Sequence, residues 1–197
     1  MKILGVDVAT EPTNILKPIV LIAILAICFV FLDKNSFALY NPLTHGQYYR
    51  LFTANFIHTN FNHLILNCFG VMLVWLFFAD HFNWPRYAGV LFICCIGSSM
   101  AGFMLLANDT IVGLSGALHG VFVYGAMRDI IEKTNIETGW LIVIGTFGKV
   151  ILENTSGLSL GSAELINARV AVEVHLSGSI CGLLLGFSSI YWQKTQK

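Results

Sequence analysis

Ser115 lies in a glycine-rich apolar stretch, His119 follows it by four residues, and His175 belongs to a separate apolar segment. A serine hydroxyl is a poor nucleophile until a base removes its proton, so a serine with a histidine in reach is a minimal catalytic pair. Side chains on a helix lean toward its N-terminus, so His119 would approach Ser115 along their shared helix axis. We therefore predict Ser115 as nucleophile and His175 as base. His119 is the alternative base, and we expect it mainly to support the His175 ring.

Attack on a peptide carbonyl also needs hydrogen-bond donors for the developing oxyanion. His58 precedes another apolar segment, and His63 and Asn67 lie four residues apart on one face of it. We predict that the backbone N–H of Ser115, His58 and Asn67 supply the donors. We expect His63 to be largely structural. Gly113 and Gly116 flank the serine and belong to the same predicted site.

The histidines also admit a different class of protein, one that binds haem or a metal ion. Imidazoles suit zinc and haem iron, and the ligands would be His58, His63, His119 and His175. However, no carboxylate or cysteine of the apolar segments joins them at ligand spacing. All five cysteines fall inside apolar runs, as packing thiols do. We predict no metal and no cofactor.

Two acid–base pairs have the four-residue spacing of helical ion pairs. They are Lys149 with Glu153, and Arg169 with Glu173. We interpret both pairs as structural, formed by ion-paired or snorkelling side chains.

The composition shows what surrounds these residues. The chain has 197 residues, of which 56% are hydrophobic and 11% charged, with a mean hydropathy of +0.73. A soluble domain carries roughly 25% charged residues, so the composition indicates a lipid environment. The net charge is zero, and no basic cluster suggests a nucleic-acid partner.

Apolar runs long enough to cross a bilayer predict an all-α polytopic membrane protein with one domain over residues 1–197. We expect six spans, at about 15–32, 63–79, 87–107, 111–127, 139–153 and 170–192. The first run follows Asp7 and Glu11 without a cleavage site, so we expect it to be a retained span. The aromatic-rich connection 33–62 suits the membrane interface, and we expect it to fold there.

The basic residues favour a topology with both termini in the cytoplasm. On that side would lie Lys2, Lys17, Arg86, Arg128, Lys133, Lys194 and Lys197, against Lys34, Arg50 and Arg169 on the other side.

In that topology spans two, four and six run in the same direction. Ser115, six residues after Asp109, and His175, six residues after Arg169, should lie at similar depth. Small residues at four-residue intervals let membrane helices pack closely, and span six has them at Gly178, Gly182 and Gly186. We therefore predict close packing of spans four and six.

These residues together form a recognisable pattern. Over about residues 45–192 the chain resembles the rhomboid family of intramembrane serine proteases. The stretch Tyr49-Arg50-Leu51-Phe52-Thr53 is similar to that family's Trp-Arg entry to the first loop. The family's later motifs appear in order as His58, His63 and Asn67, then Gly113-Leu114-Ser115-Gly116, then His175, Gly178 and Gly182.

The resemblance implies a six-span bundle with a Ser–His dyad that lacks an acidic third member. It implies that water reaches the dyad from the periplasmic side of a bacterial inner membrane. It also implies that the substrates are membrane-anchored proteins, cut near the end of a transmembrane helix. A catalytically inactive rhomboid-like protein that binds membrane clients is the rival interpretation. Such proteins are expected to lose the serine or the histidine, whereas Ser115 and His175 are both present.

Two departures from the family pattern refine the resemblance. His119 stands where most members have a tyrosine, and Glu173 and Val174 stand where small residues usually precede the histidine. The octapeptide Gly113–Gly120, Gly-Leu-Ser-Gly-Ala-Leu-His-Gly, is similar to the rhombosortase branch of Gram-negative bacteria. That branch implies secreted substrates that end in a Gly-Gly motif, a single span and a basic tail.

Overall fold

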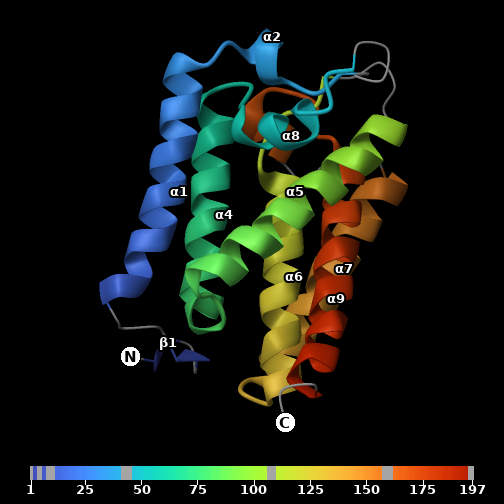
Figure 1. Ribbon diagram of the computed structural model, residues 1–197. Coiled ribbons are helices and arrows are strands. Elements are labelled where there is room, and N and C mark those ends of the chain that lie inside the picture. Colours follow the sequence, from blue (N-terminus) through green and yellow to red (C-terminus); the bar gives the residue numbers. More distant parts are fainter. Residues whose placement is uncertain are drawn as a thin grey trace.

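Lipid offers the peptide backbone no hydrogen-bonding partner, so apolar segments in a bilayer fold as helices. The computed structural model describes residues 2–3, 6–7, 12–40, 46–105, 110–156 and 162–194. Within these ranges the long helices form one bundle (Figure 1). They are α1 (Pro12–Phe31), α4 (Phe61–Phe78), α5 (Trp84–Leu105), α6 (Ser115–Glu132), α7 (Ile136–Ser156) and α9 (Val172–Lys194). The short elements are β1 (Lys2–Ile3), β2 (Val6–Asp7), α2 (Lys34–Phe37), α3 (Arg50–Thr53), η2 (Ala54–Phe56), η3 (Ala79–His81) and α8 (Ser162–Ile166).

The predicted all-α membrane fold is confirmed, since β1 and β2 are only a two-residue antiparallel pair. In the described part of the chain, three helical stretches are long and apolar enough to cross a membrane: Phe61–His81, Trp84–Leu105 and Val172–Ile190. Large apolar side chains such as Leu141, Ile144 and Leu184 are exposed on the outside of the bundle. Such a surface suits lipid rather than water.

Each predicted span overlaps one long helix, and the fourth differs most. It was expected over 111–127, but α6 begins at Ser115 and continues to Glu132. Ile111 is held in an extended bridge with Leu39. Gly113 has a φ of +108°, outside the helical region. The chain therefore enters the bundle as an extended strand and turns into the helix at the serine itself. Asp109, used to estimate the depth of Ser115, lies outside the described residues.

The long helices alternate in direction, with α4, α6 and α9 running the same way (Figure 1). Helix α6 contacts α4, α5, α7 and α9 and so occupies the centre of the bundle. The start of α1 and the end of α9 lie at one end of the bundle, and α2 and α8 lie at the other. Of the basic residues used for orientation, Lys197 and the side chains of Lys2 and Lys194 lie outside the described parts.

The connection between α1 and α4 is ordered by a buried arginine. The Nη1 group of Arg50 donates to the backbone carbonyls of Asn35 (2.8 Å) and Ala38 (2.6 Å). Its guanidinium also lies 4.5 Å from the centroid of the Tyr40 ring. These contacts fold the described residues of this connection over the end of the bundle that carries α2.

Helices α6 and α9 approach to backbone contact. A Cβ on Gly178 would overlap the carbonyl of Gly116, and one on Gly182 would overlap the carbonyl of Gly120. Gly186 instead faces the side chain of Met127. Close contact along this seam brings the first turns of the two helices together. Cysteine contributes thiols rather than cross-links, since Cys28, Cys68, Cys94, Cys95 and Cys181 are all free.

Candidate active site

Ser115 is the first residue of α6, and the residues before it set its position. The backbone N–H of Gly113 donates to the carbonyl of Ala54 at 3.0 Å. The positive φ of Gly113 is a conformation that residues with a side chain rarely adopt. A Cβ there would also meet the His63 ring, 2.5 Å from Nε2. A glycine is therefore needed at position 113, both for its backbone angle and for the close His63 ring. The turn at Gly113 places Ser115 at the N-terminus of α6.

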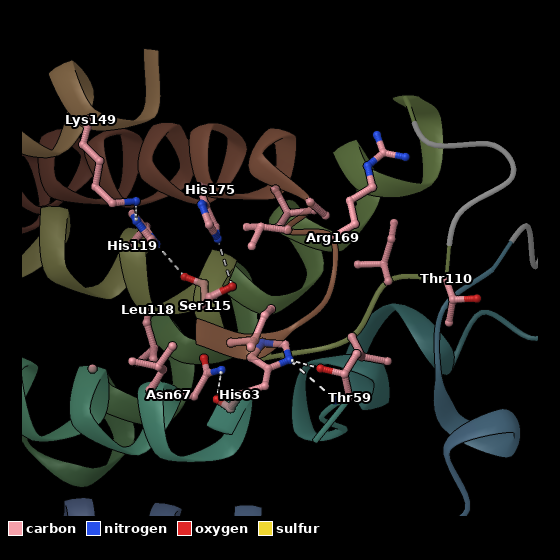
Figure 2. A pocket seen from close by; sticks show the side chains of 18 residues that line it. Thr59, His63, Asn67, Thr110, Ser115, Leu118, His119, Lys149, Arg169 and His175 are labelled. Carbon is pink, nitrogen blue, oxygen red and sulfur yellow. Dashed lines mark hydrogen bonds between the residues drawn. The ribbon is translucent and has the colours of Figure 1, made fainter. Parts of the chain in front are cut away.

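The hydroxyl of Ser115 lies 3.0 Å from Nε2 of His175, in the first turn of α9 (Figure 2). On the other side of the ring, His175 Nδ1 lies 3.3 Å from Oε2 of Glu153 on α7. A carboxylate accepts hydrogen bonds and does not donate them, so the ring proton belongs on Nδ1. Nε2 is then left with a lone pair toward Ser115. This is the tautomer in which His175 accepts the serine proton.

The ring of His119 stacks on that of His175, and both of its nitrogens are engaged elsewhere. Nδ1 lies 2.7 Å from the backbone carbonyl of Ser115, and Nε2 lies 3.3 Å from Nζ of Lys149. A carbonyl only accepts and an ammonium only donates, so His119 is neutral with its proton on Nδ1. Neither nitrogen faces the Ser115 hydroxyl. Of the two histidines weighed from the sequence, the geometry favours His175 as base.

A cavity of about 280 Å³ opens beside the pair, and Figure 2 shows its lining. Ser115, His175 and His119 form one wall, and His63 and Asn67 face them from α4. Its remaining polar lining comes from Thr59, Thr110, Lys149 and Arg169. The cavity thus brings the predicted nucleophile and base together with candidate oxyanion donors.

His63 is better placed than predicted to act as an oxyanion donor. Thr59 presents its backbone N–H (3.5 Å) and its hydroxyl (2.9 Å) to Nδ1 of His63. An acceptor at Nδ1 leaves the proton on Nε2, and the His63 side chain lines the cavity. Asn67 donates one amide hydrogen to the carbonyl of His63 at 2.9 Å. Its second amide hydrogen remains for a ligand.

His58 does not line the cavity, contrary to the role expected for it. It is buried behind His63, with the ring centroids 5.1 Å apart and the planes inclined by 79°. Burial lowers the pKa of His58 to about 3, so the ring is neutral near pH 7. His58 therefore packs behind the His63 ring and is not positioned to donate a hydrogen bond to an oxyanion. Spacing alone did not distinguish the two histidines.

Glu153 is the residue of the site that the sequence did not reveal. The expected ion pair exists, with Lys149 Nζ 2.9 Å from Glu153 Oε2. The same oxygen also reaches His175 on another helix. A four-residue spacing indicates a pair within one helix and carries no information about contacts between helices. Of the other expected pair, Arg169 precedes α9, which begins at Val172, and its side chain lines the cavity.

Within the described parts of the chain, no group of three or more His, Cys, Asp and Glu side chains is arranged to hold a metal ion. The side chains of the site offer a serine hydroxyl, an imidazole with a free lone pair and N–H donors.

Comparison with known proteins gives the class to which this arrangement belongs. The pattern of the Rhomboid domain matches residues 45–192. The chain belongs to the rhomboid family. It is 28% identical over 143 residues to RHOMBOID-like protein 6, mitochondrial, of Arabidopsis thaliana, covering 72% of this chain and 44% of that protein. It is 26% identical over 139 residues to RHOMBOID-like protein 4 of the same plant, covering 71% of this chain and 33% of that relative. The chain thus spans less than half the length of these two relatives.

Proposed function

We propose that this protein is an intramembrane serine endopeptidase with Ser115 as nucleophile and His175 as general base. The observation that carries the proposal is the 3.0 Å contact between Ser115 Oγ and His175 Nε2 at the wall of the cavity. Membership of the rhomboid family supports the same chemistry.

The mechanism is acyl transfer. The hydroxyl proton of Ser115 passes to Nε2 of His175 as Oγ bonds to the scissile carbonyl carbon. The carbonyl electron pair moves onto oxygen, where the backbone N–H of Ser115, Asn67 and His63 offer hydrogen bonds. His175 then gives the proton to the leaving amine, and the acyl-enzyme forms. Water resolves this ester, or a different amine takes the acyl group and makes the enzyme a transpeptidase.

Membrane-anchored proteins are the substrate class that suits the surroundings of the site. A second cavity, of about 260 Å³, is lined by residues of α4, α6 and α7 and is mainly apolar. It shares Gly70, Leu118, His119 and Lys149 with the first cavity. An apolar segment between α4 and α7 would therefore meet the catalytic pair at its end. This favours cleavage near the end of a transmembrane helix.

The octapeptide around Ser115 narrows the proposal to the rhombosortase branch. On that basis the substrates are secreted proteins with a C-terminal Gly-Gly motif, span and basic tail. The six-span topology in the inner membrane of a bacterium, with cytoplasmic termini, would make the site accessible from the periplasm. The start of α6, which carries Ser115, lies at the end of the bundle opposite the start of α1 and the end of α9 (Figure 1), which fits this orientation.

A fluorophosphonate probe tests the assignment, because it labels an activated serine covalently. Wild type should be labelled, and Ser115→Ala should be neither labelled nor able to cleave a membrane-anchored substrate. Ser188→Ala, at an exposed serine on α9, is the matched control and should behave as wild type. Equal labelling of Ser115→Ala and wild type would refute the assignment. A well-folded wild-type protein that takes no label and cleaves nothing would favour the inactive, client-binding alternative.

A further inference from the structure

Glu153 is a carboxylate buried within the bundle, with 0% of its surface exposed. Its Oε2 is shared between His175 Nδ1 at 3.3 Å and Lys149 Nζ at 2.9 Å. Its Oε1 is buried and has no hydrogen-bond partner in the described part of the chain. Both of these contacts are therefore made by Oε2, the oxygen that faces His175.

Burying a carboxylate carries a large desolvation cost, and a buried ion pair often stabilises a fold less than apolar residues of the same volume. Lys149 offsets part of this cost, since its ammonium pairs with Glu153 while its side chain remains 40% exposed. The unpartnered Oε1 adds to the cost. Stability alone thus gives a poor account of an acid at this position, whereas contact with His175 gives it a chemical role.

We propose that Glu153 is a positioning residue for His175, which makes the site a Ser–His–Glu arrangement rather than a dyad. The inference rests on the proposed protease function. Glu153 accepts the Nδ1 hydrogen of His175, which fixes the tautomer and aims the Nε2 lone pair at Ser115. When Nε2 takes the serine proton, the carboxylate stabilises the imidazolium and does not itself become protonated. The separation of 3.3 Å is long for a hydrogen bond, as catalytic hydrogen bonds often are in structures without substrate.

Lys149 extends the arrangement into a closed ring of contacts. From Ser115 Oγ the ring passes through His175, Glu153, Lys149 and His119, and returns to the backbone carbonyl of Ser115. His175 is thereby held at both nitrogens by Ser115 and Glu153, and on one face by His119. The charged groups Lys149 and Glu173 also lie near its ring.

The first test observes the resting wild-type protein and does not depend on a measurement of activity. In nitrogen-15 NMR of wild type with labelled histidine, the His175 signal, assigned by its absence from His175→Ala, should report a proton on Nδ1. A His175 protonated on Nε2 in the resting protein would overturn the proposal, whatever the activity of the preparation.

The second test compares kcat and KM for one membrane-anchored substrate. Glu153→Gln removes the charge and should lower kcat by about 10²–10⁴-fold, as amide substitution does in serine triads. KM should be unchanged, because Glu153 lines neither cavity. Glu153→Asp should recover part of the lost kcat. Glu173→Gln is the matched control: it removes a charge two residues from His175 that accepts no hydrogen bond from the ring, and it should keep wild-type kcat.

Wild-type kcat in folded Glu153→Gln, or equal losses in Glu153→Gln and Glu173→Gln, would overturn the role of Glu153. Either result leaves the protease assignment intact, since that assignment is decided by labelling of Ser115.

Discussion

The imidazole of His119 lies parallel to that of His175, with the ring centroids 4.3 Å apart and the planes inclined by 15°. His119 therefore forms a flat surface against which the His175 ring is held. The contact joins α6, which carries Ser115, to α9, which carries His175.

The stack gives the first prediction. His175→Ala should abolish cleavage and probe labelling. His119→Phe and His119→Tyr should keep measurable activity, because an aromatic ring at this position preserves the stack while losing the contacts to Ser115 and Lys149. Single-turnover cleavage of one membrane-anchored substrate measures the effect, with folding checked by thermal melting. An active His175→Ala beside an inactive, folded His119→Tyr would reverse the roles of the two histidines.

The second prediction separates the two histidines near the start of α4. His63→Phe keeps a ring against Gly113 but removes the N–H donor, so it should lower kcat by about 10²–10³-fold, as loss of one oxyanion donor does. Asn67→Ala should have an effect of similar size. His58→Phe is the matched variant, because it replaces a buried ring that does not line the cavity. It should lower kcat much less than His63→Phe. The reverse order would return the donor role to His58.

The third prediction concerns the seam between α6 and α9. Gly178→Ala places a methyl group against the backbone carbonyl of Gly116, so the helices must separate and Ser115 and His175 must move apart. Both thermal stability and kcat should fall. Gly145→Ala on α7 is the control, since nothing lies within 4 Å of the added methyl group. It should cleave like wild type and melt no lower than wild type, because alanine favours a helix more than glycine does. A Gly178→Ala protein with wild-type activity would show that close approach of these helices is not needed.

The fourth prediction is a dependence of stability on pH. Burial lowers the pKa of His58 from an ordinary value of 6.5 to about 3, so the unfolded chain binds this proton more readily than the folded protein. The stability linked to neutral His58 is complete above about pH 6.5 and is lost as the pH falls toward 3. His58→Phe should therefore lose less thermal stability than wild type between pH 7 and pH 4.5. Parallel melting curves for the two proteins across that interval would contradict the burial of His58.

The fold was predictable because a backbone surrounded by lipid must satisfy its own hydrogen bonds, which favours helices. Apolar length alone indicated where α1, α4, α5, α7 and α9 lie to within a few residues. The spacing of Gly178 and Gly182 correctly indicated which helices approach closely. The start of α6 was not predictable, because the backbone of Gly113 is fixed by Ala54 and His63, neither of which is a sequence neighbour.

The proximity of Ser115 and His175 was predictable, because their helices run in the same direction and the two residues lie at similar depth. Contacts that depend on the direction in which a side chain points were not predictable. His58 and His63 are both near the start of α4, and only the fold shows that one lies behind the other. Glu153 had an obvious partner in Lys149, which concealed its second contact across the bundle.

The ring of contacts through α7 has a mechanical consequence. Helix α7 carries both Lys149 and Glu153. It therefore contacts His175 through Glu153, and it contacts His119, which stacks on His175, through Lys149. An outward shift of this helix would lengthen both contacts at once. Its outer face is apolar and exposed at Leu141, Ile144 and Ile151. We therefore expect the alignment of His175 with Ser115 to depend on how closely α7 packs against α6 and α9.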